Sequence, residues 1–177
     1  ALGKLPTVGD KRGKDWAEGR PQFDKERTGA WFNHENDLYY ASVDGTVACR
    51  LTSTPAPEEL VTFSPDGRFV AFVRENDLFV VDVQTQTERA LTEGGTDLVR
   101  NGKADWVYHE EVFGRSERTY WWSPDSARIV FLQIDSTPVK RYTRVDELPE
   151  PPGVEDAPYP KPGQPNPNVR VGVVTAA

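Results

Sequence analysis

The feature that most constrains the fold of this chain is an internal sequence repeat. Residues 23–52 align with residues 63–92 without a gap, and phenylalanine recurs at the same places in both copies. The longest match is Glu-Asn-Asp-Leu, at 35–38 and again at 75–78. A fixed period of this kind is typical of architectures whose units bury their cores against one another.

A third copy of the repeat begins at Trp122. The run Trp-Ser-Pro-Asp at 122–125 matches Phe-Ser-Pro-Asp at 63–66, and Phe131 falls where the pattern requires a phenylalanine. The first two copies start at positions 23 and 63, so a regular period would start the third at position 103. A segment has therefore been inserted before the third copy.

Each repeat predicts a small antiparallel β-sheet. Ser-Pro-Asp-Gly at 64–67 has the composition of a type I turn. A strand follows over 68–74, and another returns over 78–83. The strands at 69–73 and 128–132 are apolar on both faces, so we expect their sheets to be sandwiched between neighbours. We therefore predict an all-β fold, a partial β-propeller of about three to four antiparallel blades with a short inserted helix.

The whole chain is assigned to one propeller domain, residues 1–177, and the repeat divides it into parts. We expect an irregular lead-in at 1–22, blades at 23–60 and 61–92, an insertion with a short helix at 93–121, and a blade with a proline-rich loop at 122–177.

The proline-rich loop holds nine of the fifteen prolines, between Pro138 and Pro167. We expect it to be extended and irregular, because proline supplies no ladder donor. A propeller ring typically has four to eight blades, more than this chain can supply. The chain also begins with Ala1 and contains no methionine. We therefore expect it to be cut from a longer protein.

Composition excludes several classes of function. The net charge of −7, from 28 acidic and 21 basic residues, disfavours a nucleic-acid partner. The sequence has no apolar run long enough to span a bilayer, so no membrane span is predicted. The one cysteine, Cys49, excludes an internal disulfide and a multi-thiolate metal site, and we expect it to be a small buried or half-buried side chain. No metal or cofactor is predicted.

The insertion contains Asp-Trp-Val-Tyr-His-Glu-Glu-Val-Phe at 105–113. Asp105 is a candidate N-cap, and Trp106 and Phe113 are expected to anchor a helix of about two turns. Glu110 and Glu111 would then project from the helix close enough for both to reach one small cation. The alternative is structural, because adjacent glutamates on a helix are usually a solvated face and aromatic residues are usually core.

Residues 105–113 resemble the double-glutamate motif of the dipeptidyl peptidase IV family, serine exopeptidases of the prolyl oligopeptidase superfamily. Trp-Trp-Ser-Pro-Asp at 121–125, Tyr-Pro-Lys-Pro-Gly at 159–163 and the strand-like run at 169–174 follow in the order and spacing of that family. The similar region covers about 61–174. In this family an N-terminal propeller caps an α/β-hydrolase domain.

The resemblance implies that Glu110 and Glu111 bind the free N-terminal amine of a peptide substrate, with Asp105, Trp106 and Tyr108 in support. The chemistry is consistent with this role. A peptide α-amine has an unperturbed pKa of about 7.7–8.0, so it is largely protonated at neutral pH. Two carboxylates can accept at least two of its three protons, and each such charged hydrogen bond contributes roughly 1.5–3 kcal/mol.

The chain carries no catalytic residue that the pattern reveals. It contains no Gly-x-Ser-x-Gly turn, so we expect the triad to lie in an α/β-hydrolase domain of the same parent chain. The family also holds the substrate carbonyl with an arginine, and Arg20, Arg27 and Arg74 remain candidates for that role. His109 stands where the family often has a third acidic residue, and we interpret it as a helix-surface side chain. His34 is interpreted as structural or exposed.

The resemblance also bears on location and on oligomeric state, and two alternatives to an active peptidase stay open. Relatives are commonly periplasmic or extracellular, and a homodimer is conceivable. The competing interpretation is a non-catalytic propeller that serves as a binding or scaffold module. The second alternative is a relative that kept the fold and lost the catalytic serine.

Overall fold

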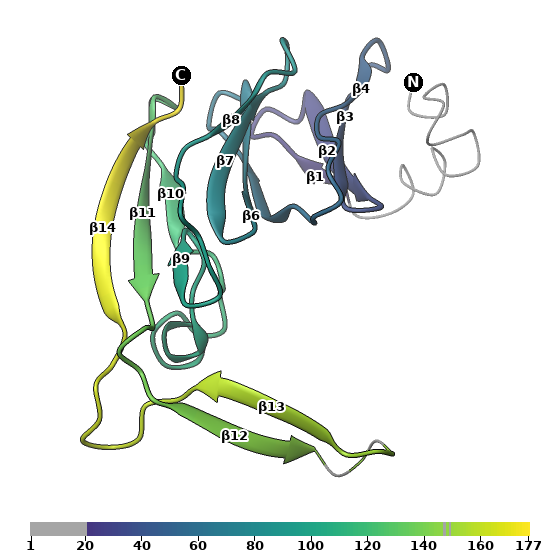
Figure 1. Ribbon diagram of the computed structural model, residues 1–177. Helices are drawn as coiled ribbons and strands as arrows, with labels where there is room; N and C mark the ends of the chain where they lie inside the picture. The colour runs from purple at the N-terminus through teal and green to yellow at the C-terminus, as the bar shows by residue number, and fades with distance from the viewer. Residues whose placement is uncertain (1–20, 147, 149) are drawn as a thin grey trace.

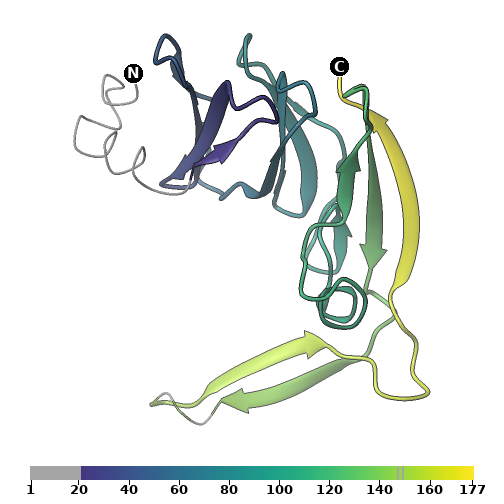
Figure 2. The same cartoon turned by 180° about the vertical axis from the view of Figure 1, so that it is seen from behind.

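The computed structural model describes residues 21–146, 148 and 150–177, so nearly all of the expected lead-in at 1–22 lies outside the described residues. Three β-sheets stand side by side, and a two-stranded arm projects from the end of the third (Figures 1 and 2). The first sheet contains, in order, β1 (Gln22–Phe23), β2 (Gly29–His34), β3 (Asp37–Ser42) and β4 (Ala48–Arg50).

The second sheet repeats the arrangement of the first. Its strands, in order, are β5 (Glu59–Phe63), β6 (Phe69–Arg74), β7 (Asp77–Asp82) and β8 (Glu88–Ala90). All pairs in both sheets are antiparallel. This is the meander expected of a propeller blade.

The third sheet is built around β11 (Arg128–Asp135), the longest strand together with β14 (Asn168–Thr175) among the described residues. Strand β14 pairs with β11 along its full length, and β10 (Tyr120–Trp122) and β9 (Val99–Asn101) pair with its other edge. The predicted partial propeller is therefore confirmed. The inserted loop runs from β9 to β10, at 102–119, so β9 and the start of β10, which were expected within the insertion at 93–121, belong to the third sheet.

Local geometry explains why Glu-Asn-Asp-Leu and Leu-Thr recur in the first two copies of the repeat. In both hairpins the two turn residues have positive φ, 52° and 71° at 35–36, and 50° and 65° at 75–76, as a type I′ turn requires. The hydroxyl of Thr52 accepts the backbone N–H of Leu38 at 2.8 Å. Thr92 accepts that of Leu78 at 2.9 Å in the same way.

The core lies between the sheets, as the two-sided apolar pattern predicts. Alternate side chains of β6 point to opposite faces, and every residue of this strand is buried. Val70 and Phe72 pack with Leu38 and Cys49 of the first sheet, whereas Ala71 and Val73 join the third sheet. Cys49 is a buried free cysteine, which confirms the prediction made for it.

The third sheet is not buried on both faces, although its apolar pattern predicted this. Ile129 and Phe131 are buried against the second sheet, but Val130 and Leu132, on the opposite face of β11, are only half-buried. The prediction that residues 128–132 are buried on both faces is therefore wrong for the outer face of β11, because no further described sheet packs against it.

The proline-rich segment was expected to be irregular, and this prediction is wrong in its middle. Strands β12 (Arg141–Asp146) and β13 (Gly153–Pro158) pair with each other as an antiparallel arm. The prolines lie at the ends of the strands or outside them, where they remove no internal ladder hydrogen bond. In the part of the chain that is described, no helix has the length and apolar character needed to cross a membrane.

Candidate functional site

The insertion is a closed loop that leaves the third sheet and returns to the same point. Strands β9 and β10 lie end to end along one edge of β11, at 133–135 and 129–131. At the junction, Thr119 N–H donates to Gly102 O at 3.0 Å and Gly102 N–H donates to Leu132 O at 2.9 Å. The loop is therefore fixed at its base, and its helix is held against the sheet.

The helix of the loop is shorter and wider than the predicted one. Its central part is a π-helix, η2 (Tyr108–Val112), and Phe113 N–H bonds to Tyr108 O at 2.8 Å. The prediction of a regular helix of two turns is corrected in this respect. Such π segments are frequent at functional sites.

Asp105 begins the helical turn, as predicted. It is buried, and its Oδ1 accepts the backbone N–H of Tyr108 at 3.0 Å. Its Oδ2 accepts the hydroxyl of Ser136 at 3.0 Å, from the segment that follows β11. One carboxylate therefore caps the turn and ties it to the sheet.

The aromatic residues fix the helix on two sides. The ring of Trp106 lies 4.7 Å from that of Tyr159, just beyond the arm, and remains 44% exposed. The ring of Phe113 lies 6.1 Å from those of both Tyr108 and Trp121. Trp106 therefore anchors the helix to the base of the arm, and Phe113 anchors it to β10.

The two glutamates differ in their surroundings. Glu110 is 31% exposed in its side chain, and its Oε2 accepts from Arg115 Nε at 3.2 Å. Its Oε1 lies 3.5 Å from Nδ1 of His109. Glu111 is exposed and makes no hydrogen bond or ion pair with another described residue. Glu110 is thus partly neutralised within the loop, whereas Glu111 is available to an incoming cation.

Arg115 is the residue that sequence reasoning missed. Its φ is +70°, its backbone N–H donates to His109 O at 2.8 Å, and its carbonyl lies 3.0 Å from Nε2 of His109. These bonds fold the end of the loop back over the helix and bring the guanidinium to Glu110. The glycine at 114, just before a basic residue, was the only sequence signal for this turn.

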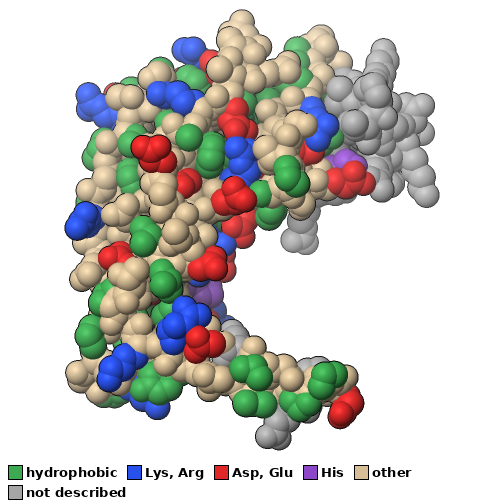
Figure 3. Space-filling view, in the orientation of Figure 1, with side chains coloured by type: hydrophobic (Ala, Val, Ile, Leu, Met, Phe, Trp, Pro, Cys, Tyr) green, Lys and Arg blue, Asp and Glu red, His purple; other side chains and the backbone are tan. Residues whose placement is uncertain are grey.

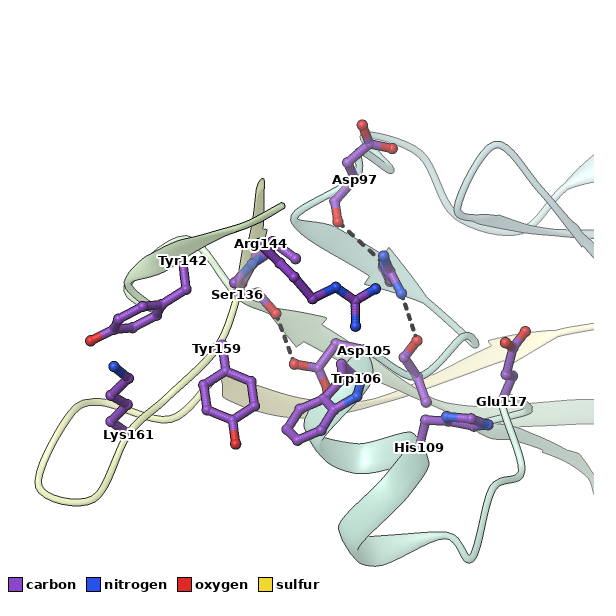
Figure 4. Close-up of a pocket in the computed structure, with 14 residues that line it drawn as sticks. Asp97, Asp105, Trp106, His109, Glu117, Ser136, Tyr142, Arg144, Tyr159 and Lys161 are labelled. Carbon is purple, nitrogen blue, oxygen red and sulfur yellow. Dashed lines mark hydrogen bonds between the residues drawn. The ribbon is translucent and has the colours of Figure 1, made fainter. Parts of the chain in front are cut away.

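A cavity of about 600 Å³ lies between the helix and the arm (Figure 4). Asp105, Trp106 and His109 line it from the helix, whereas Glu110 and Glu111 do not. The predicted site residues therefore divide between this cavity and another face of the helix. Figure 3 shows the larger hollow between the sheets and the arm, with acidic side chains along part of its wall.

The three arginines considered for the substrate carbonyl have different surroundings. Arg74 is buried, donates to Glu88 Oε1 at 2.5 Å and lies 3.3 Å from Glu58 Oε1, so its charge is balanced inside the second sheet. Arg27 is exposed, with its guanidinium 4.5 Å from the ring centre of Phe23. Arg20 lies outside the described residues.

In comparisons with known proteins, the chain is similar to dipeptidyl peptidases and dipeptidyl aminopeptidases. Residues 53–177 match the family profile described as "Dipeptidyl peptidase IV (DPP IV) N-terminal region". Dipeptidyl aminopeptidase B of Saccharomyces cerevisiae is 36% identical over 119 residues, which are 64% of this chain and 14% of that protein. Dipeptidyl aminopeptidase A of the same yeast is 38% identical over 112 residues, 59% of this chain and 12% of that protein.

A solved structure agrees with these sequence matches. The crystal structure of Porphyromonas gingivalis dipeptidyl peptidase 4 superposes with a TM-score of 0.72 at 29% identity. The superposition covers 86% of this chain and 23% of that one. The chain thus spans less than a quarter of the length of each of these three proteins.

Proposed function

This chain belongs to the dipeptidyl peptidase IV family, within its N-terminal propeller region, and on that premise we propose that its inserted helix binds the free amine of a peptide substrate. Glu110 and Glu111 are the proposed anchors. The parent protein would then be a serine exopeptidase that removes dipeptides from peptide N-termini, with its triad in an α/β-hydrolase domain outside this chain.

The observation that carries the proposal is the fixed presentation of an unpaired carboxylate beside a partly paired one. The loop base at Gly102 and Thr119 and the cap at Asp105 restrain the helix that bears both groups. Glu111 has no partner among the described residues, and Glu110 shares its oxygens with the side chains of Arg115 and His109. A protonated amine can displace or join these groups and satisfy both carboxylates.

This arrangement also explains how an exopeptidase would measure distance from a chain end. An acylated or internal nitrogen offers neither the charge nor the three donors of an ammonium group. Carboxylates held on a fixed loop therefore favour substrates that end at that point, and binding energy gained there contributes to kcat/KM.

The test is kinetic and uses the full-length parent protein. Replacing Glu110 and Glu111 by glutamine, singly and together, keeps the shape of each side chain and removes its charge. Each single change should lower kcat/KM for free-amine dipeptide substrates by roughly tenfold or more, because a charged hydrogen bond contributes roughly 1.5–3 kcal/mol. Glu93→Gln, an exposed glutamate outside the helix, is the matched control. Unchanged rates in the double variant would refute the assignment.

The remaining parts of the proposal concern the parent protein. The proposed partners are the peptide N-terminus, the hydrolase domain and, in a homodimer, a second copy; the proposed location is periplasmic or extracellular. An intact mass several times the 19.9 kDa of this chain is expected for the natural protein. A natural protein of about this mass would instead indicate a binding or scaffold module.

A further inference from the structure

The cavity between the helix and the arm has the size and walls of a ligand site. Its volume of about 600 Å³ lies within the range of about 300–1,000 Å³ that is usual for small-molecule pockets. Trp106, Tyr159 and Tyr142 form an aromatic wall, with ring centres 4.7 and 6.2 Å apart along the series. Trp106 and Tyr159 are both partly exposed, at 44% and 41%, so these rings can receive a flat partner.

Cationic groups border this aromatic wall. Arg100 donates only to the backbone carbonyls of Asp97, at 3.2 Å, and Ala104, at 2.8 Å, and forms no ion pair with a described carboxylate. Lys161 Nζ lies 3.9 Å from the ring centre of Tyr142, again without a described carboxylate partner. A hydrogen bond from Gln164 and the charge of Lys161 lower the pKa of Tyr142, which is consistent with a positive potential here.

The acidic residues of the cavity do not neutralise the positive charge beside the aromatic wall. Asp105 is buried, and both of its oxygens already accept hydrogen bonds, from Tyr108 N–H and the Ser136 hydroxyl. Asp97 and Glu117 are exposed at the rim, and the Asp97 carboxylate points away from the labelled rings in Figure 4. The side chain of Arg144 points toward the middle of the cavity in the same view.

We propose that this cavity is a second binding site, separate from Glu110 and Glu111, that takes an anion carried on an aromatic body, such as an aromatic carboxylate. The ring of the ligand stacks on Trp106 and Tyr159, and its carboxylate accepts from Lys161, which lies beside the aromatic wall (Figure 4). Arg100, on the other side of the cavity, adds positive charge (Figure 4). Stacking and charge-assisted hydrogen bonds are the two interactions that these side chains offer together.

The experiment is a calorimetric titration of the full-length protein that carries Glu110→Gln and Glu111→Gln, so that amine binding at the helix cannot contribute. The probes are 3-phenylpropionate, the neutral 3-phenylpropionamide and the cation 2-phenylethylamine, which share one aromatic body. We expect saturable binding of the carboxylate, at least about tenfold tighter than either of the others, from the charged hydrogen bonds that only it can accept.

Two variants locate the binding. Lys161→Gln should weaken 3-phenylpropionate about tenfold or more, while Lys25→Gln, which removes the same charge at an exposed position between β1 and β2, should leave it unchanged. Equal binding of the amide, preference for the amine, absence of binding or equal effects of the two lysine variants would each overturn the proposal. Because the anchor glutamates are already replaced, none of these outcomes bears on amine recognition.

Discussion

At the level of single residues, side chains of the loop itself contact only one of the two proposed anchors. Arg115 and His109 both face Glu110, whereas Glu111 faces neither. The family motif alone would treat the two glutamates as equivalent, and only the folded structure separates them. Arg115 is 79% exposed in its side chain, so its ion pair is weak and can open when a substrate amine arrives.

Removing Arg115 should therefore favour substrate binding in the full-length protein. An exposed ion pair contributes about 0.2–1 kcal/mol, so Arg115→Ala should lower KM for free-amine dipeptide substrates by up to roughly fivefold. Arg128→Ala, an exposed arginine in the third sheet, serves as the charge-matched control. A higher KM for Arg115→Ala than for the control would show that the arginine assists binding instead of competing with it.

Glu58 should make the free energy of unfolding depend on pH. Burial raises the pKa of Glu58, against hydrogen bonds from Thr54, Thr52 and Arg74, and its Oε2 is buried without a described partner. A carboxyl with a raised folded-state pKa stabilises the fold below its unfolded pKa, and this contribution is lost as pH rises through the folded value.

The stability of the wild type relative to Glu58→Gln should therefore fall as pH rises from about 4 to about 7, since glutamine does not titrate over this range. Denaturant unfolding of both proteins at several pH values measures this difference. A difference that stays constant, or grows with pH, would contradict the assigned pKa direction.

At the scale of elements, the contact between the second and third sheets depends on Tyr120. This residue is fully buried, and its hydroxyl lies within hydrogen-bond distance of the carbonyls of Leu60 and Ala71 and of the Thr62 hydroxyl. Burial raises the pKa of Tyr120, so the phenol remains protonated as a donor. The inserted loop ends just before this residue, at Thr119, so the same contact fixes the base of the loop.

Tyr120→Phe should destabilise the protein by about 1–3 kcal/mol, because it removes hydrogen bonds made by a buried hydroxyl between two sheets. Tyr40→Phe is the control, since the Tyr40 hydroxyl bonds to none of the described residues. The change in unfolding free energy of each variant is measured from its denaturant midpoint, provided that the slope m is unchanged. Equal midpoints for the two variants would show that the hydroxyl of Tyr120 contributes no more than that of Tyr40.

Some elements of the fold could be predicted from the sequence, and others could not. The hairpins at 35–36 and 75–76 were predictable because their turn residues and threonine bonds recur with the repeat. The arm of β12 and β13 was not, because the prolines around its strands dominate the composition. The π segment at 108–112 was also missed, because the spacing of apolar residues predicts a helix without fixing the width of its turns.

At the scale of the whole molecule, three stacked sheets present one inserted loop beside a projecting arm (Figures 1 and 3). The repeat predicted the stacking, and the residue pattern predicted Glu110 and Glu111 as candidates. The cavity between helix and arm could not be predicted, since it requires Tyr159, just beyond the arm, to lie beside Trp106. The proposed amine anchors and the cavity thus occupy different faces of one helix.

Recognition of a free amine by this helix can be tested with one measurement on the natural full-length protein. The measurement is the ratio of kcat/KM for a dipeptide substrate to that for the same substrate with its amine acetylated. We expect a preference for the free amine of about a hundredfold or more, because the acetylated substrate loses two charged hydrogen bonds. Equal values for the two substrates would contradict it.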